Sequence, residues 1–367
     1  MTLRADAPTS GVDHPARIGH LDGIRALAIL SVVVFHWSGG VFMGGYIGVD
    51  VFLTLSGYLI TTLLIRRREQ SLAHGYAVFM RARVRRLYPA MLGLVLGVLV
   101  LTSVVPGEPF DLLRPSVGSY AVTLFQVSWI PVVDNWGPHA QVFIHSWSLA
   151  VEWTFYAVWP WLVWRVVAGR RRPWLDVAVA SVVLWLVCAA FLPWQWFYAS
   201  PLARAAQLGA GCALALYVVP RGGGGVFMRL SRLKAEALFM ASFLVVVGWT
   251  LLGPDAGETY RWAAFAVVPL ATIGMIASGF RSVVADRLTR LPMVRAVGVA
   301  SYSIYLWHVP WMLMIDHDAL GIPRPAAAVC LIAMTGLTAA ASYWLLERPY
   351  FRARPPRRVS TPQPDPA

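Results

Sequence analysis

Ten apolar runs of about 20 residues recur along the chain, each long enough to span a bilayer as an α-helix. Only 13% of the residues are charged, whereas an ordinary soluble domain carries about 25%. The sequence therefore predicts an all-α fold class, a polytopic membrane helix bundle with about ten transmembrane helices. The predicted spans are residues 22–38, 46–65, 87–105, 146–165, 174–192, 202–219, 236–253, 262–280, 296–315 and 325–346.

Three further segments are not predicted to span the bilayer. The apolar stretch 117–133 contains Gln126 and Pro131 and lies in a long polar region, so we expect a re-entrant or interfacial piece. The N-terminal tail, residues 1–19, and the C-terminal tail, residues 351–367, are polar and rich in proline. Such segments cannot bury enough apolar surface to fold, and we expect both tails to be disordered.

The basic residues give the orientation. If the N-terminus lies inside, 26 of the 31 Lys and Arg fall in inner segments and three in outer loops, and two lie within helices. Cytoplasmic loops of membrane proteins are enriched in Lys and Arg. We therefore expect both termini in the cytoplasm and a multi-pass location in the cytoplasmic membrane. The net charge of +13 is explained by this topology, so nucleic acid is not expected as a partner.

The first predicted helix carries two ionisable side chains, Arg25 and His36. At about 100° and 1.5 Å per residue they share a face and lie roughly 16 Å apart along the axis. In one interpretation Arg25 snorkels to the inner surface and His36 makes a structural hydrogen bond. In the other, both line a cavity, and His36 takes a proton from a hydroxyl near neutral pH.

Two carboxylates and a second arginine also fall inside predicted spans, where charged groups are costly and are functional candidates by default. Asp50, near the outer end of the second span, either orients His36 or caps its helix. Glu152, in the outer half of the fourth span, is a catalytic candidate or a structural partner of Arg204. His145, seven residues earlier, shares its face if the segment is helical.

Four arginines, Arg81, Arg83, Arg85 and Arg86, cluster before the third span. They are either ordinary positive-inside anchors or a clamp for the phosphates of a nucleotide-like cofactor, because guanidinium groups bind phosphate through paired hydrogen bonds.

The ninth span contains His308 near mid-membrane, with Tyr305 on roughly the same side. Together with Arg204 they are candidates for substrate binding. The three cysteines have no metal-ligand spacing, and no metal is expected.

Five of these stretches resemble the acyltransferase-3 family of membrane acyltransferases, in family order over residues 20–350. They are Arg25 followed after ten residues by His36, then GVDVFLTLSGYLIT, the basic run ending in RRLYPA, WSLAVEWTFY and SYSIYLWH. The resemblance implies a membrane acyltransferase domain over 20–350 of the stand-alone form, without a fused esterase-like domain. It implies transfer of an acyl group, commonly acetyl, from acyl-CoA to a hydroxyl of a glycan or of a glycosylated secondary metabolite such as a macrolide.

The family's inner arginine motif is Arg-Arg-x-x-Arg before Tyr-Pro. Here it falls on Ala82, Arg83 and Arg86, so its first arginine is missing and Arg81 or Arg85 would replace it. Relatives often carry an acid three positions after the arginine of the sixth helix, where this chain has Gln207.

The expected mechanism places acyl-CoA phosphates at the inner arginines and the thioester near His36. His36 acts as general base or briefly carries the acyl group, and Asp50 or Glu152 holds or polarises it. The rival hypothesis is a proton-coupled transporter or flippase, because buried His, Glu and Arg also fit a carrier. Against it, no inverted repeat is visible in the sequence.

Overall fold

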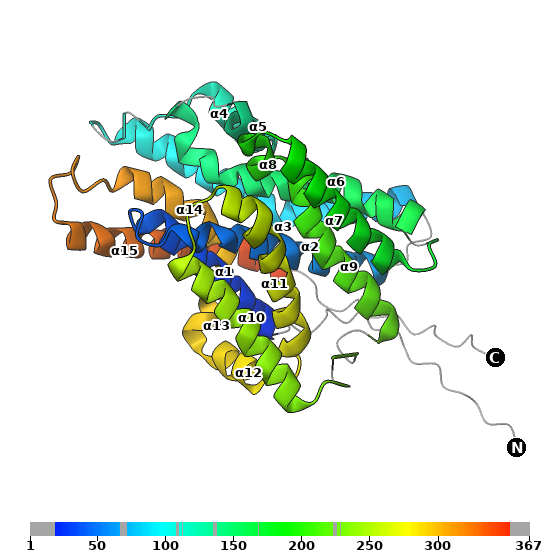
Figure 1. The fold of residues 1–367 in the computed structure, drawn as a ribbon. Helices are drawn as coiled ribbons and strands as arrows, with labels where there is room; N and C mark the ends of the chain where they lie inside the picture. The colour runs from blue at the N-terminus through cyan, green and yellow to red at the C-terminus, as the bar shows by residue number, and fades with distance from the viewer. Residues whose placement is uncertain are drawn as a thin grey trace, which may run out of the picture.

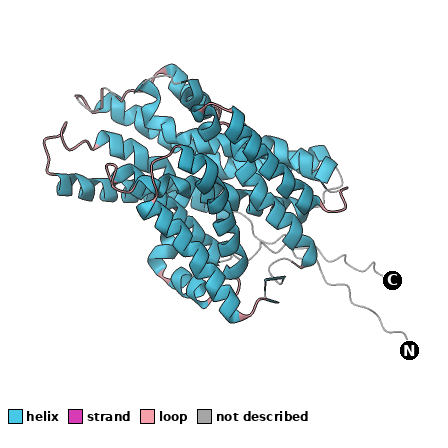
Figure 2. Cartoon of the chain, in the orientation of Figure 1, coloured by secondary structure: helices cyan, strands magenta, loops and turns pink. Residues whose placement is uncertain are grey.

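The structure is a computed structural model that describes residues 19–352, apart from 67–71, 108–109, 112, 135–137, 168, 223–225 and 228. Within these residues every regular element is a helix, as Figure 2 shows. Gly19 already belongs to the first helix, and the last helix extends to Arg352. The helices therefore extend one residue into the predicted N-terminal tail and two residues into the predicted C-terminal tail. The remaining tail residues, 1–18 and 353–367, lie outside the described part of the chain.

The helices are, in chain order, α1 (Gly19–Trp37), η1 (Met43–Ile47), α2 (Gly48–Arg66), α3 (Leu72–Val104), α4 (Val117–Leu124), α5 (Trp129–Asp134), η2 (Pro138–Ser146), α6 (Trp147–Leu162), η3 (Val163–Val167), α7 (Pro173–Phe191), α8 (Trp194–Ala199), α9 (Pro201–Val218), η4 (Val219–Arg221), α10 (Arg232–Leu252), η6 (Tyr260–Ala264), α11 (Phe265–Gly279), α12 (Val283–Arg290), α13 (Pro292–Val299), α14 (Ser301–Met314), α15 (Arg324–Ser342), η7 (Tyr343–Glu347) and α16 (Arg348–Arg352).

Eight helical segments in the described residues are long and apolar enough to cross a membrane. They correspond to eight of the ten predicted spans. The other two, predicted at 146–165 and 296–315, contain α6 with 16 residues and α14 with 14. Helix α6 continues directly into the π-helical η3, and only Ala300 separates α13 from α14. Counting both as crossings keeps the basic loops on one side, as the positive-inside distribution requires.

The stretch 117–133 is not a spanning helix, as expected. It forms the short helices α4 and α5, and Gln126 between them has a φ of 57°. Few residues other than glycine adopt this left-handed conformation, and it ends the helical path. In Figure 1 these two helices lie at the upper edge of the bundle.

Helix α1 lies inside the bundle and contacts α2, α11, α13 and α14 (Figure 1). By contrast, α7, α10 and α15 expose most of their apolar side chains, Val183, Leu244 and Leu337 among them. Exposed apolar helix faces of this length are suited to lipid. The fold class is therefore an all-α polytopic membrane bundle, and the protein is a multi-pass membrane protein.

Helices α2 and α9 pack closely because each has a glycine at the crossing. A Cβ on Gly57 would lie 2.0 Å from the carbonyl oxygen of Leu208, and one on Gly211 would lie 1.9 Å from that of Thr54. Small residues allow membrane helices to approach to backbone contact. This close packing brings the first turns of the two helices together and makes the buried contact between Asp50 and Arg204 possible.

Candidate active site

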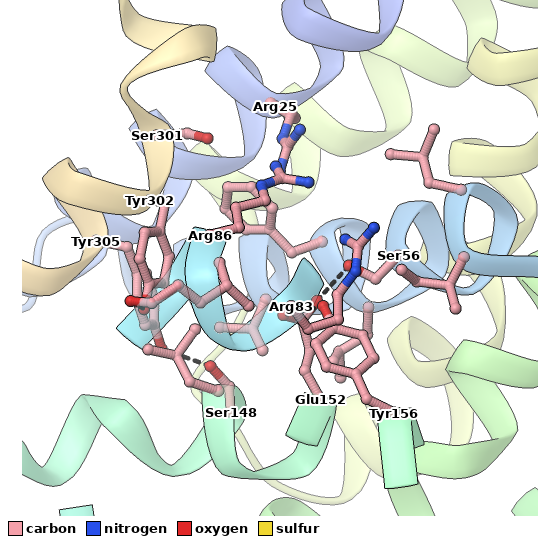
Figure 3. Close-up of a pocket in the computed structure, with 17 residues that line it drawn as sticks. Arg25, Ser56, Arg83, Arg86, Ser148, Glu152, Tyr156, Ser301, Tyr302 and Tyr305 are labelled. Atoms are coloured by element: carbon pink, nitrogen blue, oxygen red, sulfur yellow. Dashed lines mark hydrogen bonds between the residues drawn. The ribbon is translucent and has the colours of Figure 1, made fainter. Parts of the chain in front are cut away.

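A pocket of about 770 Å³, part of it open to solvent, lies between α1, α2, α3, α6 and α14 (Figure 3). Most of its lining is apolar, but each of the five helices contributes polar side chains. The polar lining residues include Arg25, Ser56, Arg83, Arg86, Glu152 and Tyr305. The pocket therefore unites groups that the sequence distributes over almost 300 positions.

Two of the four clustered arginines reach this pocket. Helix α3 begins at Leu72, well before the predicted span, so the whole arginine cluster is helical. Arg83 and Arg86 are three residues apart, share a helix face and line the pocket, to which α1 contributes Arg25. Arg81 and Arg85 are exposed and are not among the lining residues. The structure thus does not bring Arg81 and Arg85 to the position of the missing motif arginine.

The pocket lining is net positive, because three guanidinium groups accompany a single carboxylate, Glu152. The guanidinium of Arg83 lies over the rings of Phe79 and Tyr156, at 5.4 and 5.9 Å from their centroids. The Nε atoms of Arg83 and Arg25 are buried and have no hydrogen-bond partner among the described residues. Guanidinium groups in this state retain donors for an anion.

Glu152 is held by hydroxyl groups. Ser56 donates a short hydrogen bond to its Oε1, and Tyr156 donates to Oε2 over 3.1 Å. The interpretation that Arg204 is its structural partner is wrong, because Arg204 forms its ion pair elsewhere. Since Ser56 lies near the middle of α2, Glu152 is close to mid-membrane rather than in the outer half.

Arg204 is fully engaged in a buried network. Its Nη1 lies 2.6 Å from Asp50 Oδ1, and both side chains are 1% exposed. The same nitrogen donates to Gln207 Oε1 at 3.0 Å and to the Tyr260 hydroxyl, and Nε donates to the carbonyl of Tyr198 at 2.6 Å. Gln207 thus fills the position where relatives often carry an acid, and α2 supplies the acid instead.

Four aromatic rings surround the same guanidinium, at 4.8 to 5.6 Å from its carbon: Trp147, Tyr198, Tyr260 and Phe265. Because the ion pair is enclosed, the geometry gives Asp50 and Arg204 a structural role in the described state. Asp50 does not contact His36, so the expectation that it orients His36 is not supported by the hydrogen bonds of either residue.

His36 instead contacts the histidine of the ninth predicted span. Its Nδ1 lies 3.0 Å from the carbonyl oxygen of Val32 and 3.2 Å from Nε2 of His308. His308 is fully buried, whereas His36 is partly exposed and precedes the exposed residues 39–41 after α1. The pair is therefore partly accessible through His36, on the side predicted to face outward.

Tyr305 connects this pair to the pocket. Its ring lines the pocket, and its hydroxyl donates to the carbonyl of His145 at 2.6 Å and accepts from Ser148 at 2.7 Å. Its carbonyl oxygen lies 2.7 Å from Nδ1 of His308. Tyr305 and His308 thus lie between the pocket and His36.

Arg25 and His36 consequently do not line one cavity, although they share a face of α1. Arg25 belongs to the pocket, and His36 lies beyond Tyr305 and His308. His36 is not among the residues that line this pocket, so the structure does not bring Arg25 and His36 together in a single polar cavity along α1.

A family model described as an acyltransferase domain matches residues 18–345. The chain belongs to the acyltransferase-3 family. The peptidoglycan O-acetyltransferase OatA of Listeria monocytogenes is 29% identical over 355 residues, which cover 90% of this chain and 55% of that protein. The O-acetyltransferase OatA of Staphylococcus aureus is 26% identical over 349 residues, which cover 91% of this chain and 57% of that protein. No solved structure matches the chain significantly.

The chain thus spans about half the length of the curated relatives it matches. Family membership favours acyl transfer over the carrier hypothesis. The structure also adds lining and supporting residues that the sequence did not single out, notably Ser148 and Tyr260. Ser148 lies four residues before Glu152, so helical periodicity could have placed both on one face. Tyr260 follows a loop and carries no such signal.

Proposed function

We propose that the protein is a membrane O-acetyltransferase that moves an acetyl group from acyl-CoA to a hydroxyl of a cell-envelope glycan. The observation that carries the proposal is the pocket with Arg25, Arg83 and Arg86 in a chain of the acyltransferase-3 family. The pocket lies near the ends of α1 and α3 that are predicted to face the cytoplasm, where acyl-CoA is made.

The chemistry of the lining suits such a donor. The arginines supply several N–H donors for the phosphate groups of CoA, and Arg forms paired bonds to phosphate more readily than Lys. The rest of the lining is mainly apolar, with Phe52 and Leu59 from α2. Apolar walls suit the uncharged pantetheine arm, which would lead the thioester toward Tyr305.

The proposed reaction needs only two substrates, acetyl-CoA and the acceptor. The acceptor oxygen forms a bond to the acyl carbon, and the carbon–sulfur bond of the thioester breaks. His36 takes the proton of the acceptor hydroxyl at its Nε2 atom, and that proton finally reaches the CoA sulfur. Because Tyr305 lies between the pocket and His36, its side chain must move aside for the thioester to reach the acceptor, while His308 keeps its contact with His36.

The acceptor class is inferred from the relatives. The name of the Listeria protein specifies peptidoglycan, and the partly exposed His36 lies toward the predicted outer side, where envelope glycans are exposed. A glycosylated secondary metabolite such as a macrolide is the second acceptor class from the sequence, and no contact in the structure favours it.

The decisive experiment uses membranes containing the protein, acetyl-CoA labelled in the acetyl group, and separate acceptors: peptidoglycan fragments, other glycans and macrolides. We expect a base-labile labelled ester on the glycan acceptors only. Label on a macrolide alone would overturn the proposed acceptor class. Movement of a solute without consumption of acetyl-CoA would overturn the enzyme assignment in favour of a carrier.

The pocket arginines give a sharper test of the donor site. We expect Arg83→Ala and Arg86→Ala to raise KM for acetyl-CoA roughly 10- to 100-fold, because each removes a charge-assisted hydrogen bond worth about 1.5–3 kcal/mol. Arg81→Ala and Arg85→Ala change the same charge on the exposed face of α3 and serve as matched controls. Equal effects of all four substitutions on KM would indicate a general electrostatic effect and contradict the assigned pocket.

A further inference from the structure

The hydrogen positions on the histidine pair can be deduced from the partners. Nδ1 of His308 lies 2.7 Å from the carbonyl oxygen of Tyr305, and a carbonyl only accepts, so Nδ1 carries the hydrogen. His308 is fully buried, and its described hydrogen-bond partners are uncharged. A charged imidazolium would be costly there, so His308 is neutral and its Nε2 is an acceptor.

The same logic fixes the tautomer of His36. Its Nδ1 faces two acceptors, the carbonyl oxygen of Val32 at 3.0 Å and Nε2 of His308 at 3.2 Å. Nδ1 of His36 therefore carries the hydrogen and shares it between them. The other ring nitrogen, Nε2, is left with a lone pair, which is the atom that a general base needs.

A third histidine, His145, packs against His308, and its own position depends on Pro310. Pro310 has no backbone N–H, so the carbonyl of Leu306, four residues earlier in α14, lacks its usual helical donor. Nε2 of His145 lies 3.0 Å from that carbonyl oxygen and so carries the hydrogen that it donates. The His145 ring in turn packs against His308, with centroids 5.4 Å apart. Pro310 thus leaves a carbonyl free to bind His145, and the His145 ring restricts rotation of the His308 side chain.

We propose that His308 is a positioning residue that holds His36 in the tautomer with an unprotonated Nε2 and orients that nitrogen toward the acceptor hydroxyl. This inference rests on the proposed function of His36 as the base. His308 takes the part that a carboxylate plays in a Ser-His-Asp triad, where the third group fixes the tautomer and orientation of the catalytic imidazole.

The membrane setting explains why an imidazole suits this position. A carboxylate would place an uncompensated charge in the bundle, whereas a neutral imidazole supplies the same acceptor without one. The carboxylate that the sequence suggested as the partner of His36, Asp50, is already bound to Arg204 and Tyr260. His308 therefore gives orientation without the cost of a second buried charge.

The test compares His308→Leu with His308→Gln, whose side-chain oxygen can occupy the place of Nε2 as an acceptor. For His308→Leu we expect kcat to fall about 10²- to 10⁴-fold with little change in KM for acetyl-CoA, because His308 does not line the pocket. For His308→Gln we expect kcat to recover to within about tenfold of the original protein, roughly the effect of one weakened hydrogen bond. His317→Leu, in the loop after α14, is the matched control and should retain full activity.

Two further measurements distinguish failure of the inference about His308 from failure of the proposed function. Nitrogen-15 NMR of histidine-labelled protein should show His36 protonated at Nδ1, and His308→Leu should shift this signal even in a folded, inactive sample. In the His36→Ala background His308→Leu should cost nothing more, because it acts through His36. Full activity of His308→Leu, or a His308→Gln as inactive as the Leu variant, would overturn the inference. Full activity of His36→Ala would instead overturn the proposed function.

Discussion

Replacing His36 with alanine is expected to lower acetyl transfer about 10²- to 10⁴-fold, the range that a positioned acid–base group contributes. The reason is the geometry of the pair with His308, which leaves Nε2 of His36 with a free lone pair on a partly exposed side chain. The measurement is the initial rate of ester formation from labelled acetyl-CoA, normalised to the amount of protein in the membrane.

The control for this loss is His317→Ala, which removes an imidazole from a loop between α14 and α15. Because His36 is partly exposed and its hydrogen bonds do not join the α2–α9 core, we expect His36→Ala to keep the unfolding temperature of the original protein within a few degrees. Wild-type turnover of a correctly inserted His36→Ala protein would contradict the role of His36 as base.

The second large effect concerns stability. Asp50→Ala should destabilise the bundle by about 3–5 kcal/mol, because it leaves the guanidinium of Arg204, which is 1% exposed, without its carboxylate. The thermal unfolding midpoint in detergent would report the change. Asp111→Ala breaks the ion pair with Arg114, whose side chains are 51% and 56% exposed, and should cost at most about 1 kcal/mol.

A double variant distinguishes the causes. Asp50→Ala combined with Arg204→Leu removes both charges, and it should recover part of the lost stability because no unpaired charge stays buried. An unfolding midpoint of Asp50→Ala equal to that of the original protein would contradict the structural role of this pair and return both residues to the candidates for catalysis or binding.

Most of the fold could be predicted, because hydropathy and loop charge are direct consequences of the bilayer. The predictions that failed concern length. Helix α3 begins at Leu72, but its arginine-rich first half lowers the hydropathy, so only 87–105 was predicted as a span. Helices α6 and α14 are shorter than their apolar runs, because the first run continues into the π-helical η3 and the second begins in α13 and is interrupted at Ala300.

The site could be predicted as a set of residues but not as a geometry. Helical phase separates Arg83 and Arg86 from Arg81 and Arg85, yet phase alone does not say which face meets the pocket. The expected common face of His145 and Glu152 depended on a continuous α-helix, and residues 138–146 form a 3₁₀ segment instead.

Contacts between distant helices were the least predictable. Asp50 and Arg204 are 154 positions apart and meet because Gly57 and Gly211 let α2 and α9 touch. Nothing in the periodicity of either helix encodes that crossing. For the same reason His308 was identified as a polar residue in a membrane helix, but its contact with His36 was not.

The 14 residues of α14 also determine how steeply the membrane potential falls across the site. Its N-terminal residues, Ser301 and Tyr302, line the pocket, and its C-terminal end leads to a loop whose residues 316 and 318–321 are exposed. At 1.5 Å per residue α14 is about 21 Å long, whereas the hydrocarbon core of a bilayer is about 30 Å thick. Each elementary charge that crosses the full potential gains or loses about 2.3 kcal/mol per 100 mV, so a charge moved along α14 would cross that potential over a shorter distance than in the rest of the bundle.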